Sequence, residues 1–195
     1  MGNELLGGIA LFVLLHSIRI VAPSFRQNII DTIGEMAWKG VYSLLALGGL
    51  YLMVVGYADA RMNPTWIWHP PVWTRHSASL LTLLAFIFMA AAYVPGNKLK
   101  AAVGHPMYLA VKLWAAAHLL ANGGLHDIGM FGALLVWSIV GFAVSRRRDR
   151  AAGVTRESLG ASRTIATVVL GLAAWVAFAM WLHVALIGVA PFAVS

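Results

Sequence analysis

The sequence predicts an all-α, polytopic membrane protein, folded as a single transmembrane domain over residues 1–195 with about six membrane-spanning helices. Its composition is the first observation behind this prediction. Of the 195 residues, 61% are hydrophobic and only 11% are charged, and the mean hydropathy is +0.80. A soluble domain carries about 25% charged residues because its surface faces water. The composition therefore excludes an ordinary soluble enzyme, a disordered chain and a nucleic-acid-binding domain.

The second observation is a series of apolar segments near the length of roughly 20 residues that a membrane span requires. They are residues 5–22, 38–57, 77–94, 107–121, 128–144 and 164–189. Backbone groups in lipid must be paired within the segment, so we expect these continuous runs to be helices. The fourth segment is short and contains Lys112 and His118, so we expect it to be half-buried or to face a cofactor. Residues 145–163 are expected to form a linker.

The third observation is the distribution of basic residues, which predicts the orientation. With six spans, the loops after the first, third and fifth spans lie on one side of the membrane. Those loops and their flanks hold eleven of the fourteen basic residues: Arg19, Arg26, Lys39, Lys98, Lys100, Arg146, Arg147, Arg148, Arg150, Arg156 and Arg163. Short loops rich in Lys and Arg stay in the cytoplasm. Both termini are therefore expected outside the cytoplasm, and the net charge of +7 needs no nucleic-acid partner.

The residues that could carry chemistry are mainly histidines. The chain has no cysteine, which excludes thiolate ligands and the thioether attachment of haem. None of its seven acidic residues lies in the middle of a predicted span, so a membrane-embedded relay of carboxylates is not expected. Ionisable groups within a span are costly and mark candidate functional sites. His16 and His118 are in two different predicted spans.

A membrane-embedded pair of histidines is compatible with haem b. Neutral imidazole binds haem iron, which takes one or two axial protein ligands, whereas zinc normally takes three or four. His16 and His118 are therefore candidate iron ligands, although a helix-to-helix hydrogen bond is the simpler interpretation of each histidine. Arg19 and Lys112 could contact the haem propionates, or serve only as an anchor and a snorkelling side chain at the inner interface.

Three further features complete the candidate set. Asn122 is one helical turn beyond His118 and could hydrogen-bond a ligand. His105 precedes Pro106, which suits the first turn of a helix, so His105 could bind an anionic group such as a propionate or act only as a cap residue. A second metal site is the weaker alternative for the histidines expected near the outer face, which are His69, His76, His126 and His183.

Several stretches of the chain resemble the NnrU family of bacterial inner-membrane proteins. They are His16-Ser17-Ile18-Arg19, Trp38-Lys39-Gly40-Val41-Tyr42-Ser43, Ala91-Ala92-Tyr93-Val94-Pro95-Gly96, Gly104-His105-Pro106-Met107 with Val111-Lys112-Leu113-Trp114, Ala117-His118-Leu119-Leu120-Ala121-Asn122-Gly123, and Trp181-Leu182-His183 with Leu186-Ile187-Gly188-Val189. The family is similar to 15-cis-zeta-carotene isomerase, an integral membrane haem b protein. This resemblance implies axial ligation by His16 and His118. The isomerase has a cysteine where Ala115 stands here, so ligand exchange onto sulfur is excluded.

The resemblance also sets the functional expectation. NnrU proteins are associated with nitrogen-oxide metabolism and denitrification, which implies an inner-membrane haem protein with periplasmic termini and redox or nitric-oxide chemistry. Its expected partners are membrane lipid and a lipid-soluble or gaseous small molecule. The alternatives are a haem-dependent isomerase of a carotenoid-like lipid, a cofactor-free transporter or assembly protein, and a methyltransferase suggested by His105-Pro106-Met107-Tyr108. Catalytic residues are not predicted, and enzymatic activity stays open.

Overall fold

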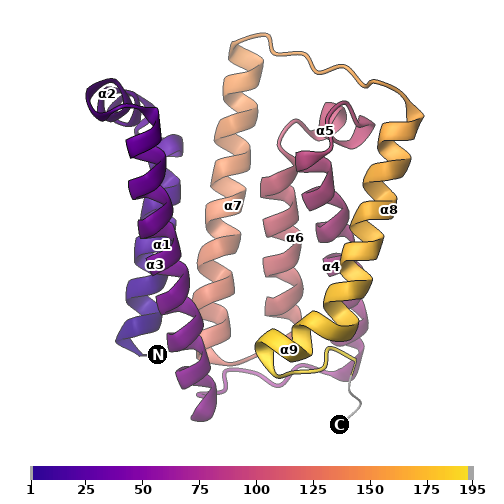
Figure 1. Ribbon diagram of the computed structural model, residues 1–195. Helices are drawn as coiled ribbons and strands as arrows, with labels where there is room; N and C mark the ends of the chain where they lie inside the picture. Colours follow the sequence, from indigo (N-terminus) through magenta and orange to yellow (C-terminus); the bar gives the residue numbers. More distant parts are fainter. Residues whose placement is uncertain (1, 193–195) are drawn as a thin grey trace. The chain divides into compact units, whose positions relative to one another are not determined.

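The computed structural model describes residues 2–192 and confirms the all-α fold class (Figure 1). Its helices are α1 (Asn3–Val21), α2 (Pro23–Ile33), α3 (Glu35–Met62), α4 (Val72–Tyr93), α5 (Lys98–Val103), α6 (Pro106–Ala121), α7 (Leu125–Ala151), α8 (Ala161–Ala177), the π-helix η1 (Phe178–Leu182) and α9 (His183–Ile187). Extended pairing within the described residues is limited to one bridge between Trp66 and Gly124.

Five helical segments are long and apolar enough to cross a membrane, so the protein is a multi-pass membrane protein. They are α1, α3, α4, α7 and the continuous segment Ala161–Ile187. The apolar helix α6 has 16 residues, which is shorter than the roughly 20 residues of a typical span. The fourth predicted span thus corresponds to the short helix that carries both Lys112 and His118.

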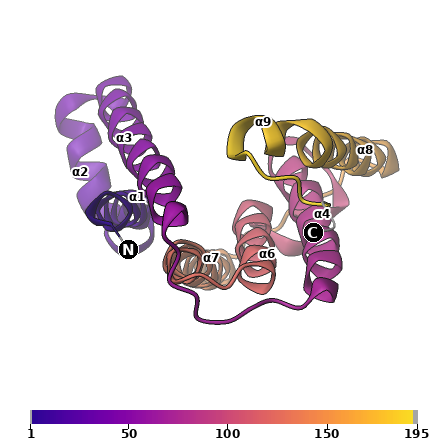
Figure 2. The ribbon, with the colours of Figure 1, turned by 90° about the horizontal axis from the view of Figure 1, so that it is seen from below.

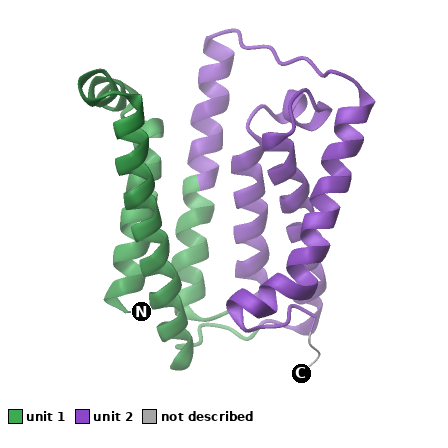
Figure 3. Cartoon of the chain, in the orientation of Figure 1, with its two compact units in different colours: residues 1–69, 123–137 green, residues 70–122, 138–195 purple. Residues whose placement is uncertain are grey.

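The chain forms two compact units, coloured separately in Figure 3. The first unit contains residues 1–69 and 123–137, and the second contains residues 70–122 and 138–195. Helix α7 contributes its first half to the first unit and its second half to the second. His16 therefore belongs to the first unit, and His118 to the second.

Close contact between α1 and α3 holds the first unit together. A Cβ atom built on Gly8 would lie 2.6 Å from the backbone nitrogen of Met53, and one built on Gly49 would lie 3.2 Å from that of Phe12. The partners follow one another in opposite order along the two helices, so the pair is antiparallel. Small residues allow backbones to approach in lipid, where association depends on packing contacts. The glycines therefore determine the separation of α1 and α3.

The short helix α2 connects α1 to α3. It begins at Pro23. Proline suits the first turn of a helix because its φ is already helical and because it has no backbone N–H that would lack a partner there. Figure 1 shows α2 nearly end-on beside the ends of α1 and α3, and Figure 2 shows it along its length. Its axis therefore crosses that of α1.

Alanines form much of the core of the second unit. Ala85 and Ala91 of α4 and Ala110, Ala115 and Ala117 of α6 are all buried, and α4 contacts both α6 and α8. Because Ala115 and Ala117 are fully buried, the alanine run before His118 contributes to helix packing. The indole Nε1 of Trp175 in α8 also donates a hydrogen bond of 3.1 Å to Thr82 Oγ1 in α4.

Two segments differ from the sequence-based expectation. The segment predicted as a linker, residues 145–163, is helical as far as Ala151. The helix ends there because Gly153 has a φ of +63°, a conformation that glycine adopts easily and that commonly ends helices. The last predicted span contains the π-helical turn η1. Such turns disturb the regular hydrogen-bond ladder and often accompany bends, and α9 bends away from the line of α8 in Figure 2.

Candidate functional site

The imidazole of His16 is held by its own helix. Its Nδ1 lies 2.8 Å from the carbonyl oxygen of Phe12, and because a carbonyl only accepts hydrogen bonds, Nδ1 must carry the hydrogen. In a neutral imidazole this leaves the lone pair on Nε2. The Phe12 ring stacks on His16 at a centroid distance of 3.9 Å, and the Tyr42 ring meets it edge-on at 5.5 Å. His16 is therefore a half-buried, oriented imidazole with Nε2 as its potential ligand atom.

His118 repeats this arrangement in the second unit. Its Nδ1 lies 2.8 Å from the carbonyl oxygen of Trp114, four residues earlier, and the two rings are 4.8 Å apart. The Asn122 side chain donates a 2.9 Å hydrogen bond to the His118 carbonyl oxygen. The Asn122 side chain thus contacts the backbone at the end of α6, and its contact with a ligand stays a prediction. His16 and His118 thus share the same tautomer and an aromatic neighbour at position i−4.

A cavity of about 270 Å³ adjoins His16. It is lined by Leu15, His16, Ile18, Arg19, Arg26, Trp38, Lys39, Tyr42 and Ser43. The lining combines apolar and aromatic groups with three cations, so it can accept a ligand that has both an apolar part and an anionic group. The structure therefore brings His16 and Arg19 to one cavity, in the spatial relationship that the sequence predicted from their spacing of three residues.

Lys112 and His105, which were predicted to contact the haem, each contact a residue of α7. The Lys112 ammonium lies over the Phe142 ring, 4.7 Å from its centroid. His105 occupies the N-cap position of α6 without a side-chain capping bond, and its Nε2 lies 2.8 Å from Asp149 Oδ2. The anionic group that His105 contacts is therefore a carboxylate of the protein itself.

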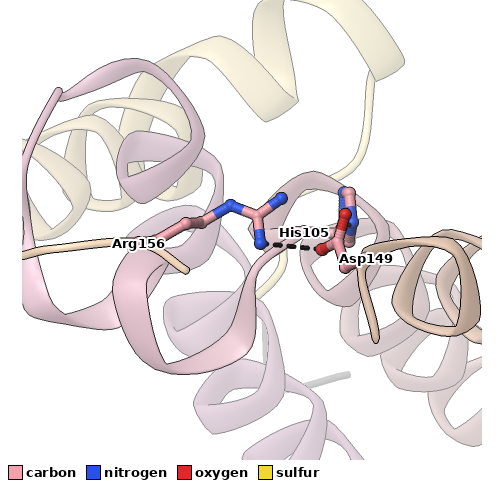
Figure 4. A network of polar contacts seen from close by, with 3 residues as sticks. All are labelled: His105, Asp149 and Arg156. Atoms are coloured by element: carbon pink, nitrogen blue, oxygen red, sulfur yellow. Dashed lines mark hydrogen bonds and ion pairs between the residues drawn. The ribbon is translucent and has the colours of Figure 1, made fainter. Parts of the chain in front are cut away.

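Asp149 also binds Arg156, which lies in the segment after α7 (Figure 4). The guanidinium Nη1 donates a 2.7 Å hydrogen bond to the same Oδ2 atom that contacts His105. Asp149 thus joins three parts of the second unit: the N-terminus of α6, the end of α7 and the following linker. Sequence reasoning missed this network because Asp149 lies within a run of arginines and carries no spacing signal toward His105.

A second buried polar cluster, also missed by sequence reasoning, lies in the first unit. The Tyr57 hydroxyl donates a 2.5 Å hydrogen bond to Asp127 Oδ1, and the Gly124 backbone N–H donates one of 2.9 Å to Oδ2. His126 lies beside them, with Nε2 3.6 Å from Asp127 Oδ1. Asp127 therefore caps the start of α7 and links it to α3. The sequence signal that could have indicated this cap is the position of the Asp127 carboxylate, three residues after Gly124 at the start of α7.

The outer histidines do not form a cluster of metal ligands. Between residues 2 and 192, no group of three or more His, Cys, Asp or Glu residues is arranged to hold a metal ion. His183 Nδ1 lies 2.7 Å from the Val189 carbonyl oxygen, and the ring of His69 packs at 5.2 Å from that of Trp66. These contacts favour structural roles over the second metal site that was the weaker alternative.

Comparison with known proteins assigns the family. Neither the curated proteins nor the solved structures contain a significant match to the chain. The family model described as NnrU protein matches residues 4–191, a range that includes all the helices described above except the first residue of α1. The chain therefore belongs to the NnrU protein family.

Proposed function

We propose that this NnrU-type membrane protein binds haem b, which His16 and His118 would hold through the iron. The observation that supports this most directly is the shared state of the two imidazoles. Each Nδ1–H donates to the carbonyl oxygen four residues earlier at 2.8 Å, which places the lone pair on Nε2. Histidines that bind metals usually donate their other ring N–H to such a partner, which fixes both tautomer and orientation.

The surroundings of His16 fit a haem ligand. The cavity beside His16 has apolar and aromatic walls and includes Arg19, so a macrocycle and a carboxylate would both find suitable neighbours there. We propose that Arg19 and Lys112 contact the propionates, and that Asn122 holds the end of the helix that carries His118. His105 is paired with Asp149 and supports α6 rather than contacting the haem.

The proposed activity is redox or nitric-oxide chemistry within nitrogen-oxide metabolism. When bound, a haem with two histidine ligands supplies one-electron transfer, or a site for a gaseous ligand if one histidine is displaced. The protein would orient the haem through the two backbone-anchored imidazoles and surround it with apolar side chains. The small-molecule partner would be nitric oxide or another ligand that reaches the site through the membrane.

The proposed location is the bacterial inner membrane, with both termini in the periplasm. The concentration of basic residues in the loops after the first, third and fifth apolar helices supports this orientation. It requires that the short helix α6 crosses the membrane as well. Alkaline phosphatase, which is active only outside the cytoplasm, is expected to be active when fused after residue 192 and inactive when fused after residue 153, and the reverse pattern would contradict the topology.

Visible spectroscopy of the purified full-length protein tests haem binding. The wild-type protein from haem-replete cells is expected to show a Soret band that shifts on reduction with dithionite. His16→Ala and His118→Ala should each lower the haem-to-protein ratio, because each removes one axial ligand. His76→Ala is the matched control, since His76 is exposed and is not a proposed ligand. Circular dichroism confirms that the variants stay helical.

Two outcomes would contradict the assignment. A colourless wild-type protein would exclude haem b as a resident cofactor. A Soret band that persists in the double variant His16→Ala/His118→Ala would show that other residues hold the iron. If the haem is present, addition of nitric oxide to the reduced protein should shift the Soret band, and an unchanged spectrum would argue against a nitric-oxide ligand.

A further inference from the structure

The cavity beside His16 contains more positive charge than one anchoring residue would require. Arg19 comes from the last turn of α1, Arg26 from α2 and Lys39 from the start of α3, and all three line the same cavity. The nine lining residues include no carboxylate. Three separate helices thus place their cations around one space, although the three positions are up to twenty residues apart in sequence.

Lys39 has one acidic neighbour outside the cavity lining. Its Nζ lies 2.8 Å from Glu35 Oε1, and the two side chains are 60% and 62% exposed. An exposed pair of this kind is weak and screened by salt, so it does not prevent Lys39 from contacting another anion. With Glu35 included, the group retains a net charge of +2, from three cations and one carboxylate.

The neighbouring helix α2 places this cavity at the level of the lipid headgroups. None of its residues is buried, and its apolar residues Phe25, Ile29, Ile30 and Ile33 recur on one face at helical spacing. Its axis crosses that of α1, as Figures 1 and 2 show. A short helix with one apolar face and a basic residue is typical of helices that lie in the membrane surface.

We propose that this cavity binds the phosphate of an anionic phospholipid headgroup. Arginine forms paired hydrogen bonds with phosphate oxygens, and lysine supplies a compact positive charge. The Ser43 hydroxyl is a further donor at the cavity wall, and Leu15 and Ile18 provide apolar contact for the glycerol and upper acyl region. The excess of cations favours an anionic lipid over a zwitterionic one, whose choline group would be repelled. Haem and lipid would share this cavity at His16 and Arg19, so the two ligands would compete, and the lipid is proposed for protein without haem.

Native mass spectrometry of the purified full-length protein tests the site with short-chain phosphatidylglycerol as the probe. Wild-type protein is expected to retain one phosphatidylglycerol at concentrations at which phosphatidylcholine dissociates. Arg26→Gln/Lys39→Gln should weaken phosphatidylglycerol binding by about tenfold or more, because it removes two contacts to the phosphate. Arg147→Gln/Arg150→Gln is the matched control, with the same loss of charge on exposed residues of α7, and should bind the lipid as wild type does.

Two additional variants separate this proposal from misfolding and from haem binding. Arg26→Lys/Lys39→Arg preserves both positive charges. If the double Gln variant loses lipid affinity because it loses charge, this charge-preserving variant should retain most of the affinity. His118→Ala, which changes a residue outside this cavity, should lower the haem content without weakening phosphatidylglycerol binding.

Three results would overturn the lipid site. Equal loss of affinity in the Arg26/Lys39 and Arg147/Arg150 variants would indicate diffuse attraction between charges instead of a defined site. Equal retention of phosphatidylcholine and phosphatidylglycerol would show that the anionic headgroup is not recognised. Displacement of the lipid by inorganic phosphate at equal concentration would assign the cavity to a free anion.

Discussion

The hydroxyl of Tyr57 donates a hydrogen bond of 2.5 Å to a carboxylate oxygen of Asp127, 70 residues later in the chain. The bond joins α3 to the start of α7 within the first unit. Asp127 is only 3% exposed, so the carboxylate has little access to water. Buried polar groups are stabilising only when they are hydrogen-bonded, which makes this contact a constraint on how the two helices pack.

Removal of the Tyr57 hydroxyl should destabilise the first unit. Tyr57→Phe leaves one Asp127 oxygen without this donor, at an expected cost of about 1–3 kcal/mol in the free energy of unfolding. Tyr51→Phe is the control, because Tyr51 lies in the same helix and is exposed. Thermal unfolding in detergent, followed by circular dichroism, should show a lower Tm for Tyr57→Phe alone. Equal Tm values for both variants would show that the contact contributes no stability.

Adjacent glycines in α1 should respond differently to the same substitution. A Cβ atom at Gly8 would lie 2.6 Å from the Met53 backbone nitrogen, whereas one at Gly7 would have no neighbour within 4 Å. Gly8→Ala should therefore cost about 1–3 kcal/mol through overpacking. Gly7→Ala should be neutral or slightly stabilising because alanine favours the helix. The comparison is made by unfolding in detergent, and a Gly8→Ala variant as stable as Gly7→Ala would refute the close approach of α1 and α3.

The ion-pair network around Asp149 should restrain the segment after α7. Asp149→Asn weakens the contacts to both His105 and Arg156, so trypsin should cleave after Arg156 faster than in the wild-type protein. Asp31→Asn has the same change of charge at an exposed residue of α2, far from Arg156 in sequence, and it should leave the cleavage rate unchanged. Mass spectrometry of the fragments over time gives both rates. Equal rates in the two variants would show that the network does not hold the linker.

Asn97 should be important for the turn between α4 and α5. This side chain is fully buried, donates to the carbonyl oxygens of Ala91 and Val94, and accepts from the Lys100 backbone N–H. Asn97→Ala leaves these groups without their partner and should cost about 2 kcal/mol or more. Asn63→Ala, at an exposed position after α3, should cost less than half of that. Urea unfolding in mild detergent measures both, and similar midpoints would contradict a structural role for Asn97.

Much of the helical architecture could be predicted from the sequence. Continuous apolar runs have few alternatives to helices in lipid, because every backbone group must find a partner within its segment. The candidate site was predicted in part for the same reason. His16 and Arg19 are three residues apart in a helix, so they had to lie on one face, and both line the cavity in the first unit.

The contacts that the sequence did not predict are those between residues far apart in the chain. His105 meets Asp149 across 44 residues, and Lys100 donates to the carbonyl oxygen of Ala92 across a turn made possible by Asn97. Local patterns do not encode such pairs, since they depend on which helix faces are opposed. For the same reason, the sequence indicated a basic anchor at Arg26 and Lys39 without indicating that they share a cavity with His16.

The sequence by itself determined that this chain forms apolar helices that span a membrane, because long continuous apolar runs and the need to pair backbone groups leave few other arrangements. It also determined the likeness to NnrU proteins, which depends only on the order of residues. The tertiary structure alone decided that the His16 imidazole shares a cavity with three cations and that His105 pairs with a carboxylate of the chain. Side-chain partners between helices follow from packing, and packing is a property of the folded chain.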